Sequence, residues 1–117
     1  MPSDQIDRLF DEHEGDLQYV GDMEPLGNSK AAKVAGLALL LIAARQAGKY
    51  DDGPTSDATI RTEVDRHGLL DSSNYTKHVA ALKPYVNING SGRTTNYKLK
   101  HDGRQRAKGL ASAALGA

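Results

Sequence analysis

The side chains able to do catalytic or metal chemistry are few and scattered along this chain of 117 residues. It has no cysteine and four histidines, none with another histidine three or four positions away as a helical zinc site would need. Ser72 and Ser73 suit a helix cap better than a nucleophile. Gly90-Ser91-Gly92 precedes a predicted strand, whereas a phosphate-binding loop precedes a helix. We therefore expect no enzymatic activity, no metal and no cofactor.

One stretch of polar residues has the composition of a surface that reads nucleic acid. In a helix predicted over residues 72–83, steps of about 100° per residue put Tyr75, Val79 and Leu82 on one side. The opposite side is small or polar and carries no acid. An amide side chain there can pair with adenine, and an ammonium can reach guanine or phosphate. The candidate DNA contacts are Ser73, Asn74, Thr76, Lys77 and Ala81. The competing interpretation is an ordinary solvated helix face, although such faces usually carry Asp or Glu.

A predicted β-hairpin after this helix offers a second basic element. Apolar and polar residues alternate over 85–89 and 95–99, and residues 89–93 between them are rich in types that tolerate positive φ. Arg93 at the tip can enter a minor groove or bind phosphate, and a plain hairpin with a solvated arginine fits nearly as well. Thr95 and Lys98 on the second strand are further candidate contacts to the DNA backbone.

Charge is divided along a chain whose net charge is zero. Residues 1–24 hold eight acidic residues and one basic residue, while from Ser72 onward eight basic residues stand against Asp102 alone. A concentrated basic stretch favours a polyanionic partner, and a solvated basic surface would have the same composition. The longest apolar run, residues 34–44, is too short to span a bilayer and too far from the N-terminus for a signal peptide. We expect a cytoplasmic protein without a membrane segment.

In the first half of the chain the pattern predicts two helices. Residues 3–13 predict an amphipathic helix, and residues 15–28, which contain several glycines and a proline, predict a loop or arm. Asn28 or Ser29 then caps a long helix. We expect this helix to end near Gly48, with that glycine in the left-handed conformation.

The second half predicts three more helices around the hairpin. Residues 57–67 form one, ended by Gly68, and Asp71 or Ser72 caps the next, which Pro84 ends. Asp102 caps the last helix. The residues of this helix that face the core are Ala107, Leu110, Ala111 and Ala114.

This order of elements resembles the winged helix-turn-helix superfamily, in the form found in bacterial transcriptional regulators. The resemblance is carried by the helix 57–67, the turn 68–71, the helix 72–82, the strands around 90–93 and the exit from Tyr97 to Arg104. It implies a single, mainly α domain with a small β-hairpin wing. The winged domain would span residues 29–117, and residues 1–28 would form an acidic N-terminal helix and arm before it. It also implies sequence-specific binding to double-stranded DNA, as a transcriptional or a plasmid or phage regulatory protein. Helix 72–83 would then lie in the major groove and the wing, residues 89–94, on the minor groove or the backbone.

Two other functions are compatible with the same fold. Winged helices also serve as protein–protein interaction modules without DNA binding, and as domains attached to enzymes without activity of their own. The basic character of helix 72–83 and of the wing favours DNA, because an interaction module would more often present an apolar or acidic helix at this position. The five tyrosines are spaced unlike the paired aromatics of a single-strand binding surface, which favours duplex DNA.

The long helix over residues 30–46 predicts a homodimer. It is apolar on nearly its whole circumference, and a winged helix normally covers only one side of it. The predicted N-terminal helix offers only Ile6, Leu9 and Phe10 as further cover, so we expect a second subunit on the remaining stripe. The pattern leaves open a second arrangement, in which residues 1–28 fold back over this helix within one chain.

Overall fold

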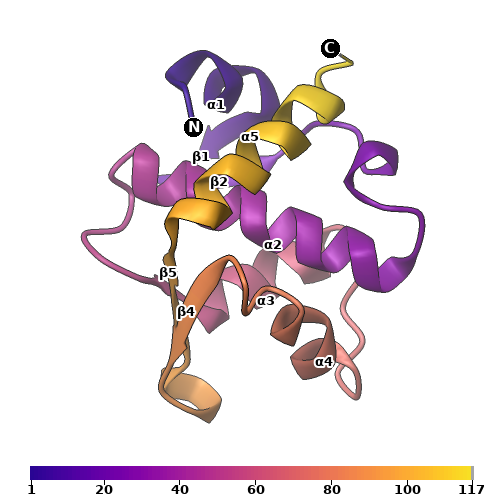
Figure 1. Cartoon of the computed structure of the whole chain (residues 1–117), viewed down its shortest axis with the longest axis vertical. Coiled ribbons are helices and arrows are strands. Elements are labelled where there is room, and N and C mark those ends of the chain that lie inside the picture. The colour runs from indigo at the N-terminus through magenta and orange to yellow at the C-terminus, as the bar shows by residue number, and fades with distance from the viewer. Residues whose placement is uncertain (117) are drawn as a thin grey trace.

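A long central helix, α2 (Lys30–Ala47), organises the molecule, and the other elements are arranged around it (Figure 1). The computed structural model describes residues 1–116. Ser29 caps α2 by accepting a hydrogen bond from the amide of Ala32 at 3.1 Å. Every residue from Gly36 to Arg45 is buried, so this helix is the centre of the hydrophobic core.

Three short strands and two helices form one end of the molecule. The strands β3 (Thr55–Ser56), β4 (Val86–Asn89) and β5 (Asn96–Leu99) form an antiparallel sheet in the order β3-β5-β4. Val86 pairs with Leu99 and Ile88 with Tyr97. The helices are α3 (Asp57–Arg66), which begins directly after β3, and α4 (Tyr75–Ala80); the turn between β4 and β5 contains a short 3-10 helix, η2 (Gly92–Thr94). The two predicted strands of the hairpin are confirmed, and β3 is an addition to it.

The N-terminal segment folds differently from the prediction. The helix α1 (Ser3–Leu9) stops before Phe10, and β1 (Phe10–His13) pairs with β2 (Asp16–Tyr19) in a hairpin. The predictions of a helix to His13 and of a loop over 15–28 are therefore wrong. Glu14 and Gly15 both have positive φ, 52° and 83°, as a tight two-residue hairpin turn requires. The strand pairing buries Phe10 and Tyr19 together, edge to face, with ring centroids 5.5 Å apart.

The remaining cover of α2 comes from the 3-10 helix η1 (Glu24–Leu26) and from α5 (His101–Ala114). The predicted inner residues of α5, namely Ala107, Leu110, Ala111 and Ala114, are buried as expected. Lys100 occupies the cap position and Asp102 lies in the first turn without a capping hydrogen bond, so the prediction of Asp102 as the cap is wrong. Residues 1–116 thus form a compact single domain with five α-helices and two small antiparallel sheets. Among residues 1–116, no helix is long and apolar enough to cross a membrane.

The apolar stripe that predicted a dimer is covered within one chain. Leu39, Leu40 and Ile42 have exposed fractions of 1%, 0% and 0%. The cover comes from β2, η1 and α5, which all pack on α2. The expectation that a bare stripe would remain on residues 30–46 is therefore wrong, because Leu17, Tyr19 and Leu26 join the core as well as Ile6, Leu9 and Phe10. Residues 1–28 fold back over the long helix, as the second arrangement supposed.

Two helix ends also differ from the prediction. At the end of α2, Gly48 has a φ of −83° and Lys49 is the left-handed residue, with a φ of 62°. The amide of Tyr50 donates to the carbonyl of Arg45 at 2.9 Å and closes this turn. Helix α4 is shorter than the predicted range 72–83, because residues 72–74 and 81–84 form turns.

Candidate nucleic-acid interface

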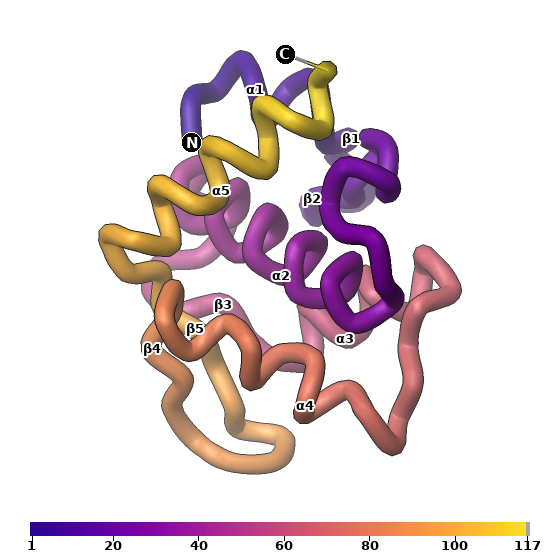
Figure 2. The backbone as a smooth tube through the Cα atoms, turned by 45° about the vertical axis from the view of Figure 1, so that its right-hand side comes forward, coloured from indigo at the N-terminus to yellow at the C-terminus, as the bar shows by residue number. Residues whose placement is uncertain are grey.

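Helix α4 and the tip of the β4–β5 hairpin lie side by side at one end of the molecule (Figures 1 and 2). Helix α1 lies at the opposite end (Figure 1). A cleft of about 370 Å³ separates α4 from the hairpin tip, and side chains of α3 form part of its wall. This end of the molecule contains most of the residues that the sequence predicted to touch DNA.

The predicted division of helix 72–83, which corresponds to α4, into a buried side and an exposed side is confirmed. Tyr75, Val79 and Leu82 are buried, with exposed fractions of 2%, 4% and 2%. Thr76 and Lys77 in α4, and Ala81 directly after it, are exposed. Residues 75–83 contain no acid, so this exposed side presents only neutral and basic groups.

Ser73 and Asn74 lie in the turn before α4, where Asp71 holds them. The hydroxyl of Ser73 and the side-chain amide of Asn74 each donate to the Asp71 carboxylate at 2.8 Å. These two hydrogen bonds, from Asn74 first and Ser73 second, lower the pKa of Asp71 to about 2. An ionised carboxylate therefore stands beside the two predicted base-reading residues, and the amide of Asn74 is already engaged by it.

The hairpin brings some of its predicted contacts to the cleft and not others. Arg93 is exposed in η2 at the tip, and Thr95 lines the cleft. Lys98 is exposed on β5 but lies beside a different hollow, together with Ala47 and Arg104. Thr76 and Thr95, from two different elements, therefore face the same cleft, whereas Lys98 is separate from it.

The floor of the cleft is a buried polar cluster around Asp57. The hydroxyls of Tyr97 and Tyr75 donate to its carboxylate at 2.7 and 3.0 Å, and the Nε of Arg61 lies 3.6 Å from it. Burial, together with the Asp57 carboxylate, raises the pKa of both tyrosines. Asp57 and Arg61 are not among the site residues predicted from the sequence. The only local signal was their spacing of four residues, which favours an ion pair on a helix but does not indicate a site.

The basic residues of the C-terminal part have no acidic partners. None of the eight lysines and arginines after Ser72 forms an ion pair with any of residues 1–116. Lys77 lies in α4, Lys83 lines the cleft and Arg93 is at the hairpin tip. The charged side chains of α4 and of the hairpin tip are therefore all basic, and the acid nearest to α4 in the sequence is Asp71, in the turn before it.

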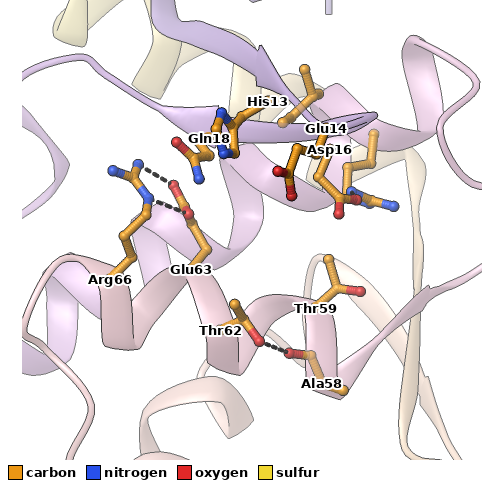
Figure 3. A pocket seen from close by; sticks show the side chains of 11 residues that line it. His13, Glu14, Asp16, Gln18, Ala58, Thr59, Thr62, Glu63 and Arg66 are labelled. Atoms are coloured by element: carbon orange, nitrogen blue, oxygen red, sulfur yellow. Dashed lines mark hydrogen bonds and ion pairs between the residues drawn. The ribbon is translucent and has the colours of Figure 1, made fainter.

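A second hollow, of about 410 Å³, lies between the β1–β2 hairpin and α3 (Figure 3). Its central carboxylate, Glu63, is buried and accepts hydrogen bonds from the amide of Tyr19 at 2.6 Å and from Arg66 at 2.7 Å. Arg66 also donates to the carbonyl of Tyr19 at 2.6 Å. Because these groups satisfy one another, the cluster serves to hold the N-terminal hairpin on α3. Over residues 1–116, no group of three His, Cys, Asp or Glu side chains is arranged to bind a metal ion.

Comparison of the chain with protein-family models, with curated proteins and with solved structures finds no match.

Proposed function

We propose that this chain is a winged helix-turn-helix protein that binds double-stranded DNA in a sequence-specific manner, with α4 in the major groove and the hairpin tip on the minor groove or the backbone. The observation that carries this proposal is the joint placement of α4 and the hairpin tip. The element order α2-β3-α3-α4-β4-β5 and the sheet order β3-β5-β4 put the exposed side of α4 next to the tip. A helix beside a projecting hairpin matches the geometry with which this class of protein binds a duplex.

The distribution of charge supports the same partner. Lys77, Lys83 and Arg93 surround the α4 surface without ion pairs among residues 1–116. None of residues 1–24 lines the cleft beside α4, and helix α1, which begins the acidic N-terminal segment, lies at the far end of the molecule (Figure 1). A duplex carries about one negative charge per 1.7 Å of its length, so unpaired cations on one surface favour it strongly.

Base reading would come from the exposed side of α4. Lys77 can reach guanine or a phosphate, and the methyl of Ala81 can touch a thymine methyl. Asn74 can read adenine only if its amide leaves Asp71, because the two are hydrogen-bonded at 2.8 Å.

The surface favours DNA over an apolar protein partner. Within residues 1–116 the one exposed large hydrophobic residue is Val20, which lies next to β2 and not on α4. A protein-interaction surface of ordinary size would present apolar or aromatic side chains at its centre. The α4 surface presents hydroxyl, methyl and ammonium groups in their place.

The test is a titration of a labelled random duplex with the protein at several salt concentrations, with fluorescence anisotropy as the measure of binding. Contact with four to six phosphates predicts a slope of log affinity against log salt of about −4 to −5. The matched control is the single strand of the same length. A protein that does not bind the duplex at low salt, or binds it independently of salt, would refute the proposed function.

A further inference from the structure

The cleft between α4 and the hairpin tip is lined by donor groups that make no hydrogen bond with any of residues 1–116. The residues that supply these donors are Arg61 of α3, Thr76 of α4, Lys83 in the turn after α4, and Thr95 of the hairpin. None of these four side chains forms a hydrogen bond with any of residues 1–116; Arg61 has only its ion pair with Asp57 at 3.6 Å. Within the described residues, three of the four donors therefore have no partner, and Arg61 uses only one edge of its guanidinium.

The charge of the cleft is positive at its mouth and negative only at its floor. Asp57 is the one acid that lines the cleft, and its side chain is 13% exposed. Its carboxylate already accepts hydrogen bonds from the hydroxyls of Tyr75 and Tyr97 and is paired with Arg61. Arg61 is 43% exposed, and Lys83 is exposed as well. A ligand entering the cleft meets two cations before it meets the shielded carboxylate.

Arg61 is also held in a fixed orientation. Its guanidinium lies over the ring of Tyr75, 4.3 Å from the ring centroid, while its Nε faces Asp57. A planar guanidinium that is stacked and paired on one edge loses little freedom when its other donors bind an anion. The remaining donors of such a guanidinium can bind carboxylate or phosphate oxygens in a bidentate manner, and phosphate is the anion that a DNA strand supplies.

We propose that this cleft holds one phosphate of the DNA backbone, with Arg61 and Lys83 as its cationic ligands and the hydroxyls of Thr76 and Thr95 as further donors. The inference rests on the proposed function, and it adds a defined contact to it. A strand that passes from α4 to the hairpin tip crosses the mouth of the cleft. The turn residues Gly90 and Gly92, which also line the cleft, have no side chains to keep that strand away.

The test compares the variants Arg61→Met and Lys83→Met with Arg8→Met in duplex binding. Arg8→Met removes the same charge from α1, at the opposite end of the molecule (Figure 1). Loss of one phosphate contact reduces the magnitude of the salt slope by about 0.9 and weakens binding about tenfold at 0.1 M salt. We expect this change for Arg61→Met and Lys83→Met and not for Arg8→Met. The side chain of Lys83 pairs with none of residues 1–116, so Lys83→Met gives a clear result even if Arg61→Met disturbs the Asp57 cluster.

A second arm replaces single backbone phosphates of the duplex by uncharged methylphosphonates. At the position that occupies the cleft, the replacement weakens wild-type binding but has no further effect on Lys83→Met. Inorganic phosphate, added alone and followed through the amide resonances of Thr76 and Thr95, shows whether the cleft instead prefers free phosphate. Normal DNA binding with unchanged slopes in both cleft variants would overturn the phosphate site alone. Absence of DNA binding by the wild-type protein would overturn the proposed function with it.

Discussion

The hydroxyl of Tyr97 lies 2.7 Å from Oδ1 of Asp57, although 40 residues separate the two in the sequence. Tyr75 donates to the same oxygen at 3.0 Å. Asp57 begins α3, Tyr75 begins α4 and Tyr97 lies in β5, so one carboxylate connects the two helices with the hairpin. The spacing between α4 and the hairpin tip, on which a fit to DNA would depend, is thereby tied to a single buried residue.

Replacing this carboxylate should destabilise the fold. Asp57→Ala leaves the buried hydroxyls of Tyr75 and Tyr97 without an acceptor, and we expect a loss of about 2–4 kcal/mol in the free energy of unfolding. Asp57→Asn keeps one acceptor oxygen and should cost less. Urea denaturation measures both, with Asp102→Ala as the control, because Asp102 is exposed and forms no ion pair within residues 1–116. Equal stability of Asp57→Ala and the wild type would show that the cluster is not a structural junction.

A matched pair of glycines in α5 gives a second test of the packing. A Cβ on Gly103 would collide with the backbone carbonyl of Tyr85 and lie 2.8 Å from Leu99, whereas a Cβ on Gly109 would meet no atom within 4 Å. Gly103→Ala should therefore destabilise the protein by about 1–3 kcal/mol. Gly109→Ala should stabilise it by up to about 1 kcal/mol, because alanine favours a helix over glycine. Thermal unfolding of the two variants should shift in opposite directions, and a shift in the same direction would contradict the packing of α5 on Tyr85.

The parts of the fold that the sequence predicted well are those with one dominant local pattern. Tyr75, Val79 and Leu82 have helical spacing, and Tyr97 and Leu99 alternate with polar residues, so their buried sides could be assigned directly. The segment 6–13 was ambiguous, because Ile6, Leu9 and Phe10 fit a helix while residues 10–19 also fit a tight hairpin. In the structure, residues 10–13 pair with residues 16–19 across the turn at Glu14 and Gly15, so this segment is a hairpin.

The candidate site could be predicted only where it lies on one element. The exposed side of α4 follows from its own periodicity. Asp57, Arg61 and Lys83 enter the cleft because α3, α4 and the hairpin meet there, and no local pattern encodes that meeting. The hydrogen bond from Asn74 to Asp71 has a different origin, because the two residues are only three positions apart. An aspartate just before a helix is typical of a cap, and that pattern does not indicate that its carboxylate binds the side chain of Asn74.

The turn before α4 should be sensitive to acid. The folded pKa of Asp71 is about 2, below its ordinary value of 3.8, because Asn74 and Ser73 donate hydrogen bonds to the carboxylate. A lowered pKa means that this stabilisation is complete above pH 3.8 and is lost as the pH falls from 3.8 towards 2. An NMR titration of the Asp71 carboxyl should have its midpoint near 2. Asp71→Ala should be less stable than the wild type at pH 6, and the difference should disappear at low pH; a difference that persists unchanged in acid would contradict this assignment.

The proposed reading of DNA by α4 predicts different effects for different basic residues. Lys77→Ala removes an exposed ammonium from the middle of α4 and should cost about 1–3 kcal/mol in binding to a selected site if it contacts a base edge. Arg93→Ala at the hairpin tip should weaken binding to many sequences alike, since the proposed contact of Arg93 is with the backbone or the minor groove. Lys108→Ala on α5 is the control. The measurement compares anisotropy titrations on a site obtained by in vitro selection with those on a random duplex. Equal losses on both duplexes for Lys77→Ala would exclude base reading by this residue.

The N-terminal segment should be required to keep α2 covered. It contributes Leu9, Phe10 and Tyr19 to the core, with exposed fractions of 1%, 4% and 1%. A chain lacking residues 1–24 loses all of these side chains and exposes part of α2, so we expect it to aggregate or to bind apolar dyes. The full chain should sediment as a monomer near 12.6 kDa, because residues 30–46 are not available to a second subunit.

The control for this truncation keeps the apolar cover and removes charge. Asp4, Asp7 and Asp11 are exposed, so the triple change of these residues to Asn should leave the protein monomeric and folded. Aggregation of the truncated chain but not of the triple variant would assign the effect to lost burial and exclude an effect of net charge. If the truncated chain stayed monomeric with an unchanged unfolding temperature, residues 1–24 would not be part of the cover of α2. If the full chain sedimented at twice the monomer mass, a surface other than the buried helix would have to form the contact.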